Sequence, residues 1–461
     1  MAEAIKMGGG ISIPSKEKFY INKNIDESIK VGDPIQFTGD YKEKSKIVYT
    51  TNDNTVHGIF RLTEHKYFYM HVIGGYNSVY GCILNTNSDN TDFSWTGTSS
   101  LPQTQLQIYG GYWSRVSVLS ANLIVIIAKN SSNVLQIAIV KISNSDAITS
   151  TVIDVTSNLS DVAFDKHIAI PVKIDSNSFY LIYANKSTPT SLYVRKITVN
   201  SDNTLTYSSV IKNLSTNQLV LNQFTKYDVV DNILALATNN TDGTHYGGVI
   251  QLDLSNINNC TLSNQVKINT VDTVVYSEQI SAVLLSPTKN TVIINGSQYE
   301  EGSSYKQHQY LAKLDITNKT TIAMVMRKLF DDTTESLGQI IKVLDNAMIL
   351  ISGVSSGNLG LRYFSYGFIT KNNKFHKHKN AVNVYNTNAN TYTAYGEYFC
   401  EMPANANRGA VFLALWRKED SGDYSTYADI AEGFTIKSME DAFDGVALTP
   451  GTSGKQIKVL F

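Results

Sequence analysis

Carboxylates are the residues of this sequence best suited to acid–base chemistry on a sugar. Glycoside hydrolysis requires two carboxyl groups about 5 to 9 Å apart. The candidates are acidic residues in polar segments, namely Glu300, Glu301, Asp331, Asp332 and Glu335. Neighbouring acids in polar loops are ordinarily solvated, and no spacing in the sequence selects one pair. A catalytic pair is therefore not predicted.

The histidines and cysteines form no recognised motif. His376 and His378 in HKHK are two residues apart, so both would lie on one face of a strand, where two imidazoles can bind a metal. No third ligand is near, and an exposed outer strand is the expected structure. Cys82, Cys260 and Cys400 have no metal-binding spacing and are expected to be buried free thiols. Because GxSxG, P-loop and HExxH motifs are also missing, no metal, cofactor or catalytic residue is predicted.

The composition argues against two classes of partner. The 461 residues carry a formal net charge of -1, with 17% charged and 42% hydrophobic residues. No basic tract offers the positive surface that nucleic acid or an anionic membrane requires. No apolar run approaches the ~20 residues of a membrane-spanning helix, and the first residues lack the apolar stretch of a signal peptide. We expect a soluble protein that binds neither nucleic acid nor membrane.

An internal repeat organises most of the chain. Short apolar runs begin at Phe68, Leu123, Phe179, Ile233, Thr291, Met348 and Ala410, so the successive spacings are 55, 56, 54, 58, 57 and 62 residues. A short polar turn precedes each run. A turn at a fixed place in the period is typical of a repeated hairpin.

Each repeat contains four strand-like segments. In the second repeat these are RVSVLS, LIVIIA, VLQIAIVKIS and ITSTVIDV. Four consecutive strands joined by short turns form an antiparallel meander, and such sheets arranged radially form a β-propeller. We predict an all-β fold with a seven-bladed propeller at residues 45–434. The last repeat lacks a fourth strand, and KIVYTT (Lys46 to Thr51) is expected to supply it and so close the ring.

The two ends of the chain are expected to form one small domain. Residues 1–44 and 435–461 each contain strand-like segments around a tight turn, and neither hairpin would be stable alone. Joined, they would close a split β-barrel or sandwich, and the resemblance given below implies that this domain docks the propeller onto a larger particle. The predicted docking residues lie in these turns and strands: Val31, Gly32, Asp33, Pro34, Gly445, Gly451, Gly454 and Val459.

Aromatic residues are predicted to line a binding face of the ring. In a meander, the loops between second and third strands and the loops between blades emerge on the same face. The aromatic residues in these loops are Tyr76, Tyr109, Tyr112, Trp113, Tyr246, Tyr299, Tyr305 and Tyr424. Aromatic planes suit sugar rings and protein interfaces. A cell-surface polysaccharide or a neighbouring subunit is the expected ligand.

The terminal segments resemble proteins of tailed bacteriophages and phage-like particles. IKVGDPIQF and DGVALTPGTSGKQIKVLF resemble a small β-barrel domain of phage structural proteins, and the opening MAEAIKMGGG is similar to the N-termini of tail-fibre and baseplate proteins from phages of low-GC Gram-positive bacteria. The resemblance covers only the two ends of the chain. It implies a non-enzymatic structural protein of the virion, present in many copies and bound to other virion proteins.

A second interpretation remains open, namely a carbohydrate-active propeller enzyme or a lectin. The stretch SDNTDFSW (Ser88 to Trp95) is the nearest match to the SxDxGxTW box of propeller sialidases. It lacks the glycine and occurs once. A carboxylate-lined central pocket and turnover of a glycan would support the enzyme.

Overall fold

The computed structural model describes the strands and many of the turns of this chain. The described residues are 18–22, 34–38, 46–51, 55–73, 78–88, 93–96, 115–129, 134–155, 158–159, 169–184, 191–215, 225–239, 244–269, 280–300, 306–331, 339–343, 348–354, 361–369, 373–377, 382–386, 398–402, 411–420, 423–431, 435–438, 445–447 and 456–460. The chain divides into two compact units, one of residues 1–43, 401–413 and 430–461 and a larger one of residues 44–400 and 414–429.

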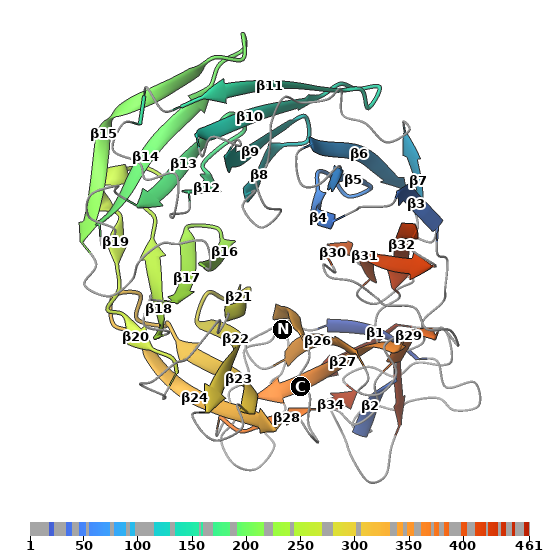
Figure 1. The fold of residues 1–461 in the computed structure, drawn as a ribbon. Helices are drawn as coiled ribbons and strands as arrows, with labels where there is room; N and C mark the ends of the chain where they lie inside the picture. Colours follow the sequence, from blue (N-terminus) through green and yellow to red (C-terminus); the bar gives the residue numbers. More distant parts are fainter. Residues whose placement is uncertain are drawn as a thin grey trace, which may run out of the picture. The chain divides into compact units, whose positions relative to one another are not determined.

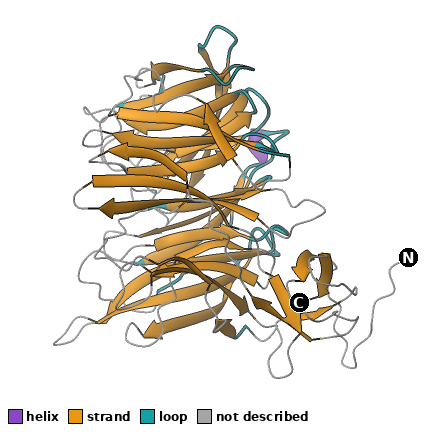
Figure 2. Ribbon diagram, turned by 90° about the vertical axis from the view of Figure 1, so that its right-hand side faces the viewer, coloured by secondary structure: helices purple, strands orange, loops and turns teal. Residues whose placement is uncertain are grey.

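The protein is an all-β protein that contains a β-propeller. Strands make up most of the described chain (Figure 2), and its one helical element is the 3-10 turn η1 (Ile257–Asn259). None of the described residues belongs to a helix long enough to cross a membrane.

Five sheets with described side chains form blades of the propeller, and the first strand of each is innermost (Figure 1). The first two blades contain β4 (Thr55–Arg61), β5 (Lys66–Ile73), β6 (Ser78–Thr86) and β7 (Phe93–Thr96), then β8 (Arg115–Ser120), β9 (Leu123–Lys129), β10 (Leu135–Ile142) and β11 (Ile148–Asp154). The third contains β12 (Ala169–Lys173), β13 (Ser178–Ala184), β14 (Ser191–Val199) and β15 (Leu205–Ser215).

The next two blades follow the same order. One contains β16 (Lys226–Val230), β17 (Ile233–Asn239), β18 (His245–Gln251) and β19 (Thr261–Leu262), with β20 (Val266–Lys267) also paired to β18. The other contains β21 (Ile280–Leu285), β22 (Thr291–Glu300), β23 (Lys306–Asp315) and β24 (Ala323–Asp331). The predicted four-strand repeat is therefore confirmed in these blades.

Further strands form two more sheets and a barrel. One sheet contains β25 (Gln339–Val343), β26 (Met348–Val354), β27 (Leu361–Ile369), β28 (Phe375–Lys377) and β29 (Val382–Asn386). The other has the order β3 (Lys46–Thr51), β32 (Asp423–Ala431), β31 (Val411–Asp420) and β30 (Tyr398–Met402). The closed barrel consists of β1 (Lys18–Asn22), β33 (Thr435–Ser438), β2 (Pro34–Thr38), β34 (Gly445–Ala447) and β35 (Gln456–Leu460).

The second strand of a blade is buried on both faces because neighbouring blades cover it. In β13 every residue is buried. Phe179, Leu181 and Tyr183 pack with residues of the preceding blade, whereas Tyr180 and Ile182 pack with residues of the following one. Side chains alternate between the faces of a strand, which explains why a continuous apolar run is required here.

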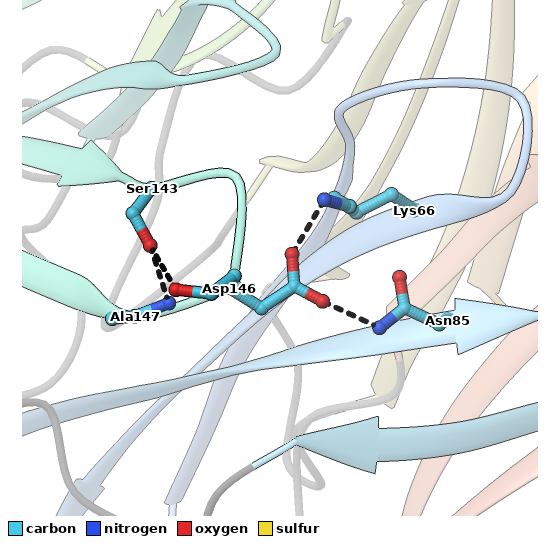
Figure 3. A network of polar contacts seen from close by, with 6 residues as sticks. Lys66, Asn85, Ser143, Asp146 and Ala147 are labelled. Carbon is cyan, nitrogen blue, oxygen red and sulfur yellow. Dashed lines mark hydrogen bonds and ion pairs between the residues drawn. The ribbon is translucent and has the colours of Figure 1, made fainter.

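Polar contacts join the outer parts of neighbouring blades. Asp146, in the turn between β10 and β11, has a φ of 63° and accepts hydrogen bonds from Lys66 and Asn85 of the preceding blade (Figure 3). At the next boundary Lys141 Nζ donates to the carbonyl oxygen of Ser201, 2.9 Å away, in the turn between β14 and β15. At both boundaries, a lysine of one blade contacts the turn between the third and fourth strands of the following blade.

Candidate functional site

The candidate site lies at the first residues of the inner strands β8 and β16. Arg115 begins β8, and its Nη2 donates to the carbonyl oxygen of Thr225, 3.3 Å away, directly before β16. The guanidinium carbon also lies 5.6 Å from the centre of the Tyr227 ring. The blade of β12 to β15 separates these two strands in chain order. Side chains that bridge such strands must lie close to the axis of the ring.

Lys226 is the first residue of β16 and points toward the following blade. Tyr227 and Val229 pack against the apolar cluster shared with the preceding blade. Asp228, on the opposite face of the strand, accepts a hydrogen bond at 2.7 Å from the backbone N–H of Leu285 in β21. Because side chains alternate along a strand, Lys226 shares the face of Asp228.

The electrostatic environment of Lys226 is unusual for a lysine. Burial, and next the positive charge of Arg115, lower its pKa from 10.5 to about 8. Among the described residues, no carboxylate contributes to this shift. The side chain is half-buried and keeps some exposed surface. A lysine with a pKa near neutrality can accept and donate protons under physiological conditions.

His245 and Tyr310 form a buried polar pair, and His245 lies on the same face of this blade as Lys226. Asn239 at the end of β17 is paired with His245 at the start of β18, and Lys226 is paired with Ala237 two residues earlier in β17. His245 Nδ1 is 2.7 Å from the hydroxyl of Tyr310 in β23. The imidazole of His245 therefore connects this blade to the following one, on the face that also carries Lys226.

His245 is held in its neutral form. Its backbone N–H donates to Asn269 Oδ1 at 2.9 Å, and its side chain is fully buried. Burial, followed by the charge of Arg327, lowers its pKa from 6.5 to about 4. The guanidinium carbon of Arg327 lies 5.5 Å from the centre of the Tyr310 ring. Because neither His245 nor Tyr310 has exposed surface, this pair supports the site and does not contact a ligand.

The aromatic residues predicted to bind a ligand are only partly within the described residues. Tyr246 in β18 is half-buried and packs against the apolar cluster between two blades. Tyr299 lies in β22 and Tyr424 in β32. The others, Tyr76, Tyr109, Tyr112, Trp113 and Tyr305, lie outside the described residues. The predicted aromatic binding face remains a prediction.

The predicted docking residues that the structure describes lie in the barrel. Pro34 pairs with Val446, Gly445 with Ile35, and Val459 with Lys18. Val31, Gly32, Asp33, Gly451 and Gly454 lie outside the described residues. The structure thus brings both ends of the chain into one closed sheet, and their role in docking stays a prediction.

The structure describes only some of the other candidates from the sequence. Glu300 ends β22, Asp331 ends β24 and His376 lies in β28, whereas Glu301, Asp332, Glu335 and His378 lie outside the described residues. Within the described residues no three His, Cys, Asp or Glu side chains are grouped as metal ligands. Cys82 and Cys260 are buried free thiols, as expected, and Cys400 lies in β30.

Sequence reasoning missed Arg115, Lys226 and His245. One signal for the first two was available, because both are cations at the first position of the first strand of a repeat, in RVSVLS and KYDVV. Most of the inner strands begin with uncharged residues, for example Ala169 in β12 and Ile280 in β21.

Comparison with known proteins supports the propeller fold but assigns the chain to no family. No protein-family model matches the chain, and no curated protein matches its sequence. The periplasmic gluconolactonase of Pseudomonas aeruginosa matches with a TM-score of 0.51 at 9% identity, over 80% of this chain and 96% of that structure. An ulvan lyase matches with a TM-score of 0.45 at 9% identity, over 90% of this chain and 98% of that structure. At such identities the likeness shows the propeller fold alone.

These comparisons correct two predictions from the sequence. The chain was expected to be a non-enzymatic virion structural protein, whereas the gluconolactonase whose propeller fold it shares is an enzyme. The prediction of a non-enzymatic protein is therefore wrong on these findings, which agree better with the alternative of a carbohydrate-active propeller. The virion location and the virion partners stay predictions.

Proposed function

We propose that the protein is a carbohydrate-active enzyme whose site lies at the start of β8 and β16. The observation that carries the proposal is the half-buried Lys226 at the start of β16, directly after Thr225, whose carbonyl oxygen accepts a hydrogen bond from Arg115 of β8. Burial is the main cause that lowers the pKa of Lys226 to about 8. Strongly perturbed ionisable groups that converge at one point are typical of functional sites. The fold of the gluconolactonase agrees with this function, although it carries no argument about residues.

The chemistry that suits this pair is general-base catalysis next to a carbonyl group. The neutral amine of Lys226 would accept a proton from water or from a carbon beside the carbonyl. The guanidinium of Arg115 would stabilise the negative charge that develops on the carbonyl oxygen. Its contacts with Thr225 and Tyr227 fix its position before the substrate binds.

The test is turnover on a panel of sugar lactones and polysaccharides. We expect the wild-type protein to convert at least one of them, with kcat rising as Lys226 loses its proton near pH 8. Lys226→Met should lower kcat by about 10²- to 10⁴-fold, the usual contribution of a general base. Lys173→Met is the matched control, because Lys173 is exposed at the opposite end of the inner strand β12.

Two results would contradict the proposal. Equal turnover by Lys226→Met and the wild-type protein would remove Lys226 from the mechanism. Binding of a glycan by the wild-type protein without turnover of any substrate would instead make the protein a lectin.

We infer further that the ring has seven blades and that the barrel is a domain split by the propeller. The antiparallel pairing of β3 with β32 and the barrel strands from both ends of the chain support this inference. Thr50 pairs with Ser425, so cysteines at these two positions should form a disulfide that joins the ends of the ring. Failure to cross-link under oxidising conditions would contradict closure by β3.

A further inference from the structure

We infer that Thr225 is a positioning residue of the candidate site, because its buried hydroxyl group fixes the backbone from which Lys226 extends. The inference rests on the proposed function and adds a residue that acts through Lys226 and does not contact the substrate. It stands on the hydrogen bond that Thr225 Oγ1 donates to Thr238 Oγ1, 3.0 Å away. Neither threonine has exposed surface.

The pair of Thr225 and Thr238 continues the pairing of β16 with β17 by one step. Lys226 and Ala237 form the first pair of this antiparallel ladder, so the residues next to them, Thr225 and Thr238, stand opposite each other. Opposite Cβ atoms in such strands are about 4.5 to 5.5 Å apart, close enough for two threonine hydroxyls to meet. Because the ends of an element open more readily than its centre, a hydrogen bond directly before Lys226 keeps the start of β16 in place.

Lys226 stands between two neighbours that are both anchored. Before it, the carbonyl oxygen of Thr225 also accepts a hydrogen bond from Arg115 Nη2, 3.3 Å away. After it, Tyr227 packs against the apolar cluster shared with the preceding blade, and the guanidinium carbon of Arg115 lies 5.6 Å from the centre of its ring. Because side chains alternate along a strand, these anchors fix the backbone while the side chain of Lys226 lies on the other face.

The pair of hydroxyl groups is not needed to build a blade of this propeller. In the two preceding blades the residue equivalent to Thr238, which is the sixth of its apolar run, is a buried alanine. Replacing both partners of a buried hydrogen bond by apolar groups of the same shape is often nearly neutral for stability. A directional bond at this place therefore serves position more than stability. The equivalent residues are Ala128 in β9, Ala184 in β13 and Thr238 in β17, and their runs begin at Leu123, Phe179 and Ile233.

Two variants of Thr225 test the inference by turnover. Thr225→Val replaces the hydroxyl by a methyl group of nearly equal size, so it removes the hydrogen bond and keeps the burial. We expect its kcat to fall about tenfold or more, because a small displacement of a catalytic group is costly, while KM changes less than about twofold. Thr225→Ser keeps the hydroxyl and should restore most of kcat. An unchanged kcat in a folded Thr225→Val variant would overturn the inference.

A double variant separates position from stability. Thr225→Val combined with Thr238→Val removes both hydroxyl groups, so the midpoint of urea unfolding should return toward that of the wild-type protein. We expect kcat to stay low, because the bond that holds the start of β16 is still missing. Recovery of kcat together with the midpoint would make Thr225 a purely structural residue and overturn the inference. If Thr225→Val does not fold, the double variant decides.

The amine of Lys226 gives a readout that requires no substrate. Lysines are dimethylated with isotope-labelled formaldehyde and titrated by NMR, and the signal of Lys226 is the one missing from Lys226→Met. Burial, and next the charge of Arg115, lower the pKa of Lys226 to about 8. We expect Thr225→Val to raise this pKa by about 0.5 or more, because water reaches a loosened Lys226, and Thr225→Ser to leave it unchanged. All variants keep the ionisable residues described on β8, β16 and β18 around Lys226, namely Arg115, Tyr227, Asp228 and His245.

The two readouts separate this inference from the proposed function. A raised pKa of Lys226 in Thr225→Val, without turnover of any substrate by the wild-type protein, would support the positioning role and reject the enzyme. Turnover that depends on Lys226, with the pKa of Lys226 and kcat both unchanged in Thr225→Val, would support the enzyme and reject the positioning role.

Discussion

Lys66 Nζ lies 2.5 Å from Asp146 Oδ1, and the two residues belong to neighbouring blades (Figure 3). Their side chains are 24% and 12% exposed, so the pair is partly shielded from solvent. Asn85 Nδ2 donates to the second carboxylate oxygen of Asp146 at 2.9 Å. One turn residue therefore binds both the second and the third strand of the blade before it.

Loss of the Asp146 carboxylate should loosen this boundary between blades. Asp146→Asn keeps a residue that tolerates the left-handed φ of 63° but removes the charge, so we expect a loss of about 1 kcal/mol in the free energy of unfolding. Asp146→Ala should lose about 1 kcal/mol more because alanine disfavours this conformation. Urea unfolding of both variants measures the difference. If the Ala and Asn variants are equally stable, the left-handed backbone conformation at position 146 does not contribute to the difference in stability.

Gly296 should not tolerate a side chain. A Cβ atom at this position would lie 2.4 Å from the hydroxyl oxygen of Tyr310 and 2.6 Å from its ring. We expect Gly296→Ala to destabilise the protein by about 1 to 3 kcal/mol and to disturb the contact of Tyr310 with His245. Thermal and urea unfolding measure this effect.

Gly247→Ala is the matched control for Gly296→Ala. Its Cβ would lie 3.1 to 3.3 Å from the terminal methyl groups of Leu314, Ile268 and Ile294, which can shift. We expect less than about 1 kcal/mol of destabilisation there. If Gly247→Ala lowers the free energy of unfolding more than Gly296→Ala does, the packing around Tyr310 is looser than these distances indicate.

The fold was more accessible to sequence reasoning than the site. The regularly spaced apolar runs mark the second strand of each blade. This strand must be apolar on both faces because it is buried on both, as β13 illustrates. The convergence of Arg115 and Tyr227 depends on two strands that lie close only near the axis of the ring. No local pattern encodes that contact, since Arg115 and Thr225 are 110 residues apart.

The contact between His245 and Tyr310 was missed for a related reason. His245 stands in no motif, and its contact with Tyr310 joins residues 65 positions apart. Tyr310 lies outside the apolar runs that mark the second strands, although it is among the largest fully buried side chains described. Tyr69, Tyr180 and Tyr183 belong to the runs that begin at Phe68 and Phe179, and they are buried as expected. The strand register decides which tyrosine is buried, and composition alone does not supply it.

Protonation of His245 should destabilise the protein in mild acid. The pKa of His245 is about 4 in the folded protein and near 6.5 when the chain is unfolded, so the unfolded state binds the extra proton first. Stability should therefore fall as pH is lowered from 6.5 to 4, by roughly 3 kcal/mol from this residue. His245→Asn, whose amide can replace Nδ1 as a partner of Tyr310, should flatten the profile in this pH window. An unchanged pH slope in the variant would assign the effect to other groups.

Lys226 should lower stability at neutral pH, as expected if it is kept for function. Its pKa is about 8 in the folded protein and 10.5 without burial, so below pH 8 the folded state carries the full unfavourable charge. Between pH 8 and 10.5 the folded state binds fewer protons than the unfolded state, and this penalty disappears as pH rises. Lys226→Met should therefore raise the free energy of unfolding at pH 7 by about 1 to 3 kcal/mol, with a smaller gain at pH 10. Urea unfolding at both pH values, with Lys173→Met as control, measures the effect. A variant that is less stable than the wild-type protein at pH 7 would show that Lys226 is a structural residue, because a site residue held in an unfavourable state must stabilise the fold when it is removed.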